Sequence, residues 1–397
     1  MKKIILFCGE VETLGYFSLQ LADAFRKLGH EVMMFDFLAE KNSFQALQAF
    51  REDRNTVMVS FNFSGIRQDE IFYGEDGELF WDRYQIPCYN IVVDHPFYYH
   101  ELIRKRPKFY RQICIDRDHR RYMERFFPEV ELCPFLPLGG TRLNDREEAV
   151  PLRERPIELV FTGNYTPPHT FDKHITRIDE EYTAFYRSII DALIVNPELA
   201  MEEVFETFLR KEMPDITEDE LATCMENMVF IDLYIRFYFR GIVVRTLADH
   251  GFRVHVFGKG WNLLECDHPE NIIDGDSLDS FGCLQVISKA KISLNVMPWF
   301  KDGAHDRIFN SMLNGAVCLT DPSRYLTEVL QEGMDVIFYS LKEIDRLPSI
   351  VEQLLADPDG MEQISQTGYQ KATGYHTWEC RAKMLTQWIE EEGRQDE

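Results

Sequence analysis

The sequence lacks any apolar run that approaches the roughly 18 residues of a membrane-spanning helix. Its first ten residues, MKKIILFCGE, are too few for a signal peptide and predict a first β-strand instead. We therefore expect a cytoplasmic protein without stable membrane insertion.

Basic residues are scarce. The chain has 43 Lys and Arg against 67 Asp and Glu, and its net charge is −24. Most of the surface would repel a nucleic-acid backbone or an anionic membrane, so neither is an expected partner. A local basic pocket for one diphosphate stays compatible with this total.

The nine cysteines are scattered and form no CxxC pair, which argues against a disulfide framework and against a structural zinc site. Hydrophobic residues make up 45% of the 397 residues and aromatic residues 13%. This composition supplies apolar surface for packed cores, and the length favours two domains.

Apolar runs alternate with amphipathic helical stretches along the chain. The first βαβ unit combines runs at 4–8 and 32–37 with a helix at 17–28 that ends at Gly29, and further strands are predicted at 56–61, 87–93 and 112–115. A second set of runs begins at residue 157 and continues to residue 339. The pattern predicts an α/β protein with two Rossmann-like, doubly wound parallel sheets.

The charged segment at 139–156 lacks apolar periodicity and is the expected domain boundary. We assign residues 1–150 to an N-terminal domain and 151–375 to a C-terminal domain with a helical insertion at about 170–249. An amphipathic final helix at 376–397 is expected to pack back on the N-terminal domain. The insertion is expected to serve packing, with acceptor binding or homo-oligomerisation as alternatives.

The segment at 292–323 carries the strongest chemical signal. A buried strand leads into a loop that contains Asp302, and a helix then begins near Arg307 and ends before Gly315. Free N–H groups at a helix start and the helix dipole suit a diphosphate, to which His305 and Arg307 can add charge-assisted bonds. An ordinary βαβ crossover is the alternative for this segment alone.

Three other predicted strands end in polar, glycine-containing loops. Because carboxyl ends of parallel strands meet at one sheet edge, these loops should converge on the same ligand. Their glycines would allow close approach of the backbone, and a lysine would neutralise a phosphate. The residues concerned are Gly163, Asn164, Gly258, Lys259, Gly260, Gly275 and Ser277.

The motifs DLYIRFYFRGIV, FGKGW, HDRIFNSMLNGAVCLTD and HTW resemble those of GT-B glycosyltransferases, in particular the CgeB-like group and bacterial proteins with the DUF3880 domain. The resemblance covers most of residues 90–380. It implies two Rossmann-like domains, a nucleotide-sugar donor in the C-terminal half and an acceptor in the N-terminal half. A UDP-sugar is the favoured donor, and the acceptor is a glycan or a protein.

The resemblance also implies roles for single residues. In GT-B enzymes with a Glu-x7-Glu motif, the first Glu falls on Asp302 and the second, which binds the ribose, falls on Asn310. Asp306 lies between these positions, and the loop with Gly275 and Ser277 would hold the base. Because Asn310 replaces an acid, the retaining mechanism of that motif is not implied here.

Catalytic candidates in the N-terminal domain follow its strands. Asp94 and His95 come after the apolar run YNIVV, and one of them can act as general base for an acceptor hydroxyl. The alternative is that Asp94 caps the following turn while His95 packs beside Pro96. Gly9 and Glu10, after the first strand, are candidates on the acceptor side.

No cofactor or essential metal is expected, because the GT-B enzymes that the chain resembles use helix dipoles and basic side chains in place of a divalent ion. The acidic and basic residues at 116–119 suit a helix N-cap better than a metal site. Two other functions stay open: a nucleotide-sugar epimerase on the same scaffold, and a sugar-nucleotide-binding scaffold protein without catalysis.

Overall fold

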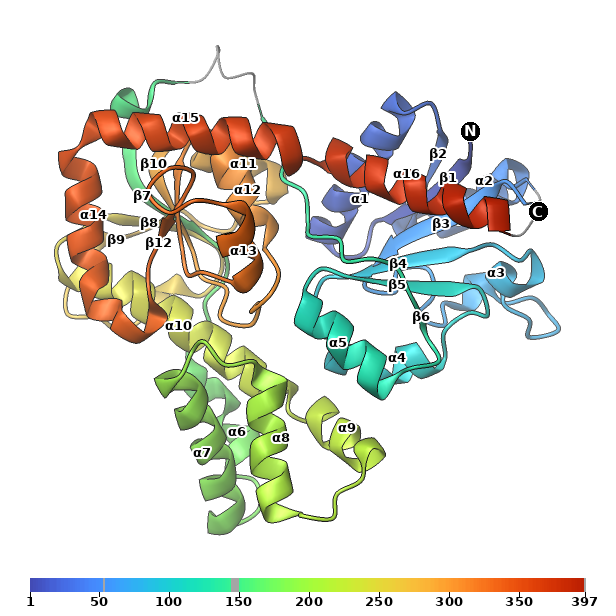
Figure 1. Cartoon of the computed structure of the whole chain (residues 1–397), viewed down its shortest axis with the longest axis horizontal. Coiled ribbons are helices and arrows are strands. Elements are labelled where there is room, and N and C mark those ends of the chain that lie inside the picture. Colours follow the sequence, from blue (N-terminus) through green and yellow to red (C-terminus); the bar gives the residue numbers. More distant parts are fainter. Residues whose placement is uncertain (53, 144–149, 396–397) are drawn as a thin grey trace. The chain divides into compact units, whose positions relative to one another are not determined.

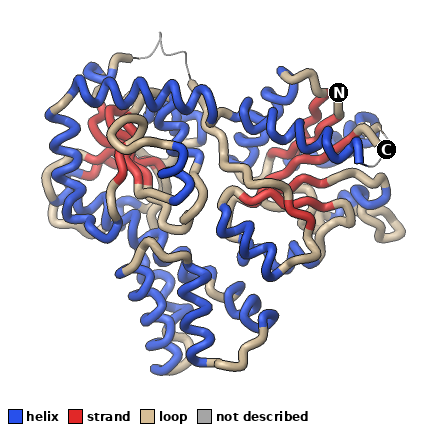
Figure 2. The backbone as a smooth tube through the Cα atoms, in the orientation of Figure 1, coloured by secondary structure: helices blue, strands red, loops and turns tan. Residues whose placement is uncertain are grey.

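The computed structural model describes residues 1–52, 54–143 and 150–395. The chain divides into two units, Met1–Gly139 with His376–Glu397 and Gly140–Tyr375. Each unit contains one six-stranded parallel sheet with helices around it (Figures 1 and 2). The prediction of an α/β protein with two parallel sheets is confirmed.

The sheet of the first unit has the strand order β2-β1-β3-β4-β5-β6. Every residue of its central strand β3 is buried, as expected for a strand covered on both faces. The predicted apolar runs locate five of the strands, and only the two-residue β6 lay outside them. The strands are β1 (Lys3–Cys8), β2 (Glu31–Asp36), β3 (Thr56–Phe61), β4 (Cys88–Val92), β5 (Tyr110–Cys114) and β6 (Glu131–Leu132).

The final helix packs within this first unit, against α1. The ring of Trp378 lies 5.0 Å from that of Phe17, and His30 Nε2 lies 3.1 Å from the hydroxyl of Thr386. Both helices bury an apolar stripe, which explains the pairing. The α-helices of the unit are α1 (Glu12–Lys27), α2 (Glu40–Phe50), α3 (Phe80–Arg83), α4 (His100–Arg104), α5 (Arg117–Phe126) and α16 (Trp378–Gln395).

The sheet of the second unit has the order β12-β11-β10-β7-β8-β9. Its register brings strand ends together, because Thr162 pairs with Phe257 and Asn295 pairs with Thr320. The strands are β7 (Ile157–Thr162), β8 (Val254–Phe257), β9 (Ile272–Asp274), β10 (Ala290–Asn295), β11 (Val317–Thr320) and β12 (Ile337–Phe338).

Between β7 and β8 the described elements are all helical. Helices α6 (Asp172–Ile175), α7 (Glu180–Val195), α8 (Met201–Glu212) and α9 (Glu218–Glu226) lead into α10 (Val229–Asp249). Figure 1 shows α7, α8 and α9 in green, projecting beyond α10. We call residues 172–228 the helical lobe.

Helix α10 connects the helical lobe to the sheet and buries residues on several faces, among them Ile231, Val243 and Ala248. None of the described helices is long and apolar enough to cross a membrane. The other α-helices of the second unit are α11 (Ser280–Ile287), α12 (Asp306–Leu313), α13 (Arg324–Val329), α14 (Leu347–Ala356) and α15 (Pro358–Tyr375).

Candidate functional site

The loops that follow β7, β8 and β9 are joined by backbone hydrogen bonds at the carboxyl edge of the second sheet. Gly163 N donates to Phe257 O at 2.8 Å, and Tyr165 N donates to Lys259 O at 2.9 Å. The third loop is attached by Gly258 N, which donates to Asp276 O at 3.0 Å. These bonds join three of the four segments that the sequence placed at one edge, and a hydrogen bond from Arg307 to Thr162 O joins the fourth.

The glycines of these loops allow close contacts between protein segments. A Cβ atom on Gly258 would lie 2.4 Å from the carbonyl oxygen of Gly163. A Cβ atom on Gly275 would lie 2.1 Å from the ring of Phe257. Any side chain at either position would push the loops apart.

Arg307, from the first turn of α12, reaches under the loop after β7. Its Nη1 donates to Thr162 O at 2.6 Å, and its guanidinium lies 5.6 Å from the ring centre of Phe161. Gly163 makes room for it, because a Cβ atom there would lie 2.8 Å from Nη1. The residue is 9% exposed, and its Nη2 is buried without a hydrogen-bond partner among the described residues.

A second buried guanidinium, which the sequence reasoning missed, comes from α10. Arg240 is 8% exposed and its Nη1 donates to Asn164 O at 2.9 Å. Its Nε is also buried without a partner among the described residues. The guanidiniums of Arg240 and Arg236 lie 5.4 and 4.3 Å from the ring centre of Trp299. The spacing i, i+4 of these two arginines, on one face of a helix, was the available signal.

The guanidinium groups of Arg236, Arg240 and Arg307 concentrate positive charge at this edge of the sheet. Burial, and then the charges of Arg307 and Arg236, lower the pKa of Arg240 well below its usual value. Burial is also the main cause that lowers the pKa of Arg307. Because a guanidinium stays protonated in proteins, buried N–H groups of this kind favour an anionic partner.

Two buried carboxyl groups lie near the arginines. Asp306, in the first turn of α12, and Asp321, after β11, each have an electrostatic interaction with Arg307. Asp321 accepts a hydrogen bond from Met297 N at 2.8 Å, while burial raises its pKa to about 6. The sequence analysis did not select Asp321, although this residue follows β11, whose carboxyl end lies at the same edge of the sheet.

The start of α12 differs from the prediction of free N–H groups. His305 is the N-cap residue, and its Nδ1 accepts from Arg307 N at 3.3 Å. The amide of Ile308 donates to His305 O at 3.2 Å. Burial lowers the pKa of His305, which therefore favours a neutral ring as acceptor. Side chains of arginine, rather than these two amides, are available to an anion.

Both polar atoms of the Asn310 side chain are bonded to neighbouring protein groups. Its Oδ1 accepts from Thr141 N and its Nδ2 donates to Asp306 Oδ2, both at 2.8 Å. One turn later, Asn314 Nδ2 donates to Thr141 O at 2.8 Å. Both amides thus fasten the segment near Thr141 to α12. Asp302 is 5% exposed, and its Oδ2 lies 3.4 Å from Arg324 Nε.

The remaining predicted donor-side residues are more accessible. Lys259 and Ser277 are exposed, and Asn164 is exposed as well. Asn164 Oδ1 accepts from Lys259 N at 2.9 Å, which places the lysine beside the loop that Arg240 contacts. Lys259 itself lies in the loop after β8, which this bond attaches to the loop after β7, and its exposed side chain extends the basic site toward solvent.

In the first unit, Asp94 and His95 have different surroundings. Asp94, after β4, is half-buried, and its Oδ2 accepts from Asn62 Nδ2 at 2.9 Å and from the hydroxyl of Tyr99 at 3.0 Å. His95 is buried, and its Nδ1 accepts from Phe97 N at 3.2 Å. The capping residue of the turn is thus His95 and not Asp94.

Glu10 follows β1 at the same carboxyl edge as Asp94. Its carboxylate accepts a hydrogen bond from the hydroxyl of Ser64 and lies 4.0 Å from Arg67. Gly9 has a local reason for being glycine: its φ is +92°, and a Cβ atom would lie 2.4 Å from Asp36 Oδ1. Asp116 caps α5 by accepting from Asp118 N at 2.7 Å, in agreement with the N-cap interpretation.

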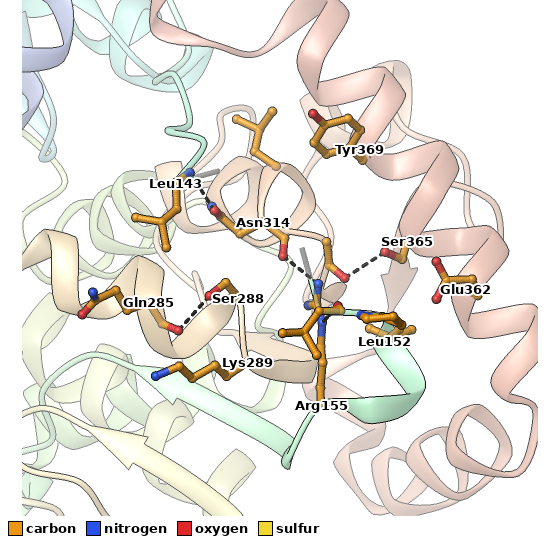
Figure 3. Close-up of a pocket in the computed structure, with 14 residues that line it drawn as sticks. Leu143, Leu152, Arg155, Gln285, Ser288, Lys289, Asn314, Glu362, Ser365 and Tyr369 are labelled. Carbon is orange, nitrogen blue, oxygen red and sulfur yellow. Dashed lines mark hydrogen bonds between the residues drawn. The ribbon is translucent and has the colours of Figure 1, made fainter. Parts of the chain in front are cut away.

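A cavity of about 300 Å³ in the second unit lies at the opposite edge of the sheet from this site (Figure 3). Its Arg155 precedes β7 and donates to Ala290 O at 2.9 Å and to Asn314 O at 3.1 Å. Lys289 and Gly315, which also line it, directly precede β10 and β11. Since each guanidinium nitrogen of Arg155 already donates to a backbone carbonyl, we do not assign the nucleotide-sugar donor to this cavity.

Residues 240–387 match a family model described as glycosyl transferase-like. The matched segment begins at Arg240 and includes Arg307. No sequence match to a curated protein is found.

Several solved structures share the fold over nearly the whole chain. AviGT4, a glycosyltransferase involved in avilamycin A biosynthesis, is 12% identical with a TM-score of 0.53, covering 99% of this chain and 98% of its own. An α-glucosyltransferase solved with UDP-glucose and DNA containing an abasic site is 10% identical with a TM-score of 0.52, covering 98% and 99%. Sucrose-phosphate synthase from Thermosynechococcus elongatus is 12% identical with a TM-score of 0.50, covering 98% and 99%.

These likenesses confirm the predicted GT-B fold. The segment at 240–387 is similar to glycosyl transferases, in agreement with the predicted class.

Proposed function

We propose that this protein transfers a sugar from a nucleotide diphosphate donor, with UDP as the favoured nucleotide, to a hydroxyl or amide of a glycan or protein acceptor. We further propose that it is one of the CgeB-like glycosyltransferases, on the motifs that carry this resemblance. The solved structure of an α-glucosyltransferase with UDP-glucose supports a UDP-sugar on the same fold. Nine free cysteines fit a reducing cytoplasm as the place of action.

The pair of buried arginines is the observation that carries this proposal. Arg240 and Arg307 each leave one guanidinium nitrogen buried and without a partner among the described residues. A buried donor without a partner costs about 1–3 kcal/mol, and more for a charged group, so a bound diphosphate would stabilise both. Charge also grows on the departing diphosphate during transfer, which is where fixed cations lower the barrier.

We assign the roles of the donor-side residues according to how exposed each side chain is. Buried Arg240 and Arg307 would hold the diphosphate, and exposed Lys259 would add a charge from the solvent side. The loop with Gly275 and Ser277 would contact the base. We retain Asp302 and Asp306 as residues that orient the site through Arg324 and Asn310 rather than as ligands of the donor.

On the acceptor side we propose Asp94 as general base, with Glu10 as a neighbouring acceptor contact. Asp94 keeps part of its surface exposed while Asn62 and Tyr99 orient one of its oxygens. A carboxylate in this state can accept a proton from a hydroxyl that comes within hydrogen-bond distance. We propose transfer without a metal ion, because arginine side chains can neutralise the diphosphate.

Calorimetry with UDP, UMP and uridine tests the diphosphate site. Arg240→Gln should weaken UDP about 10- to 100-fold, the loss expected for a charge-assisted hydrogen bond of 1.5–3 kcal/mol, and leave uridine nearly unchanged. Arg245→Gln is the matched control, because Arg245 is an exposed arginine on the same helix. Equal losses in both variants, or an equal loss for uridine, would contradict the assignment.

A further inference from the structure

The helical lobe carries an apolar groove that the proposed chemistry does not use. Two adjoining hollows of about 440 and 570 Å³ share Met213 and Cys224 in their walls. The larger is lined by the 213–224 segment, and the smaller extends beneath Tyr182, Phe185 and Tyr186 of α7. Because the two hollows share these residues, we treat them as one groove between α7, α8 and α9.

The floor of the groove is aromatic and incompletely covered. Tyr182, Phe185 and Tyr186 are each only half-buried, and their rings contact one another at 4.7 and 5.2 Å between centres. Met213 is 42% exposed, and Ile178, next to the lining residue Arg177, is 61% exposed. Contiguous exposed apolar surface of this kind marks an interaction site more often than a free surface.

The rim of the groove is acidic. Glu212, Asp215 and Asp219 line it and are exposed, and no residue in the described part of the chain forms an ion pair with any of them. Among the basic residues nearby, Arg210 binds Glu206 and Glu218, and Arg187 binds Asp172. Arg177 lines the smaller hollow and donates a hydrogen bond to the hydroxyl of Tyr182. Residues 172–228 contain fifteen acidic and five basic residues, so the lobe has a net charge of −10.

We propose that this groove binds a basic, amphipathic helical segment of another protein. The half-exposed aromatic floor fits the apolar face of a helix, as in other helix-in-groove interfaces, and the acidic rim fits flanking lysines or arginines. Charge selects this occupant over a second copy of the chain, because a chain of net charge −24 would bring further negative charge to the rim.

Peptide binding to the full-length protein tests the proposal. The probes are two fluorescent 18-residue amphipathic helices with the same leucine face, one with lysine and one with glutamate on the polar face. Fluorescence anisotropy should show micromolar binding of the lysine peptide, at least tenfold weaker binding of the glutamate peptide, and weakening of the former with salt.

Variants locate the binding surface. Asp215→Lys with Asp219→Lys should weaken the lysine peptide at least tenfold, and Met213→Gln should weaken it several-fold. Asp191→Lys with Glu203→Lys makes the same change in net charge at exposed positions of α7 and α8 that do not line the groove, and Val195→Gln replaces an exposed apolar residue elsewhere on the lobe. These controls should bind within twofold of the unaltered protein.

Three results would overturn the proposal. One is equal binding of the two peptides, which would show nonspecific apolar adsorption. Another is an equal loss in the control variants, which would show that net charge alone attracts the peptide. The third is a dimer in light scattering that Met213→Gln dissociates, because the groove would then be an interface between copies of this chain. Circular dichroism of each variant verifies that the helices remain folded.

Discussion

Arg240 and Arg307 hold the same loop from two different helices. Arg240 donates to the carbonyl of Asn164 and Arg307 to that of Thr162, two residues earlier, while each keeps another guanidinium nitrogen without a partner in the described structure. Both side chains also lie near the ring of Phe161, at 6.0 and 5.6 Å. The loop after β7 is thus the support on which two cations are positioned.

If one diphosphate neutralises both cations, their contributions to binding must be coupled. We expect Arg240→Gln and Arg307→Gln each to weaken UDP about 10- to 100-fold. The double variant should lose less than the product of the two factors, because the remaining arginine and the ligand readjust in either single variant. Calorimetric titration of the four proteins measures the coupling, and strictly multiplicative losses would indicate separate anion sites.

Gly163 is expected to control the placement of Arg307. In Gly163→Ala the new methyl group would lie 2.8 Å from Arg307 Nη1, so the guanidinium must move and UDP should bind several-fold more weakly. Gly374→Ala is the control, because nothing lies within 4 Å of a Cβ atom there. If Gly163→Ala binds UDP as well as Gly374→Ala does, Arg307 does not contact the donor in the position described here.

A substitution of Asn310 distinguishes a structural role of this residue from a role in ribose binding. Asn310→Ala removes the partners of Thr141 N and Asp306, which should lower the free energy of unfolding by about 1–3 kcal/mol. Affinity for uridine should change less than twofold. Urea denaturation and calorimetry measure the two effects. A large loss of uridine affinity with unchanged stability would instead support contact between Asn310 and the ribose.

Acid should destabilise the first unit through two buried histidines. Burial is the main cause that lowers the pKa of His100 to about 3 and that of His119 well below its usual value. The unfolded chain therefore binds protons below about pH 6.5 that the folded one does not. Stability should be fully present above pH 6.5 and fall toward pH 3, by up to about 1.4 kcal/mol per pH unit for each histidine.

Urea midpoints between pH 4.5 and 7.5 measure this dependence. His119→Gln should reduce the slope, whereas His250→Gln should leave it unchanged because His250 is exposed. An identical slope in His119→Gln would mean that other groups dominate the acid response.

The sequence predicted most strands because their signal is local. Runs such as those of β1, β3 and β10 are apolar and end in polar loops, so their position and their common edge could be inferred. The sequence analysis missed Arg240 because its partner Asn164 lies 76 residues earlier in the chain, before the helical lobe. His305 and Asn310 were selected by position. His305 caps its own helix, whereas Asn310 bonds to the segment near Thr141, a contact that only the tertiary packing determines.

The two catalytic candidates of the first unit should separate in kinetics. Asp94→Asn keeps the size of the side chain but removes the base, so turnover should fall about 10²- to 10⁴-fold with nearly unchanged affinity for the donor. His95→Ala removes the cap of the turn at Pro96 and a buried ring that packs 4.0 Å from Phe97. It should lower stability by about 1–3 kcal/mol while the folded fraction keeps its specific activity.

Tyr99→Phe is the control for the Asp94 substitution, because it removes one hydrogen bond to Asp94 but leaves the carboxylate. Initial rates of UDP release in the presence of acceptor, together with urea denaturation, distinguish the outcomes. If Asp94→Asn loses stability but not turnover, Asp94 orients Asn62 and Tyr99 and the base lies elsewhere, with Glu10 as the next residue to replace.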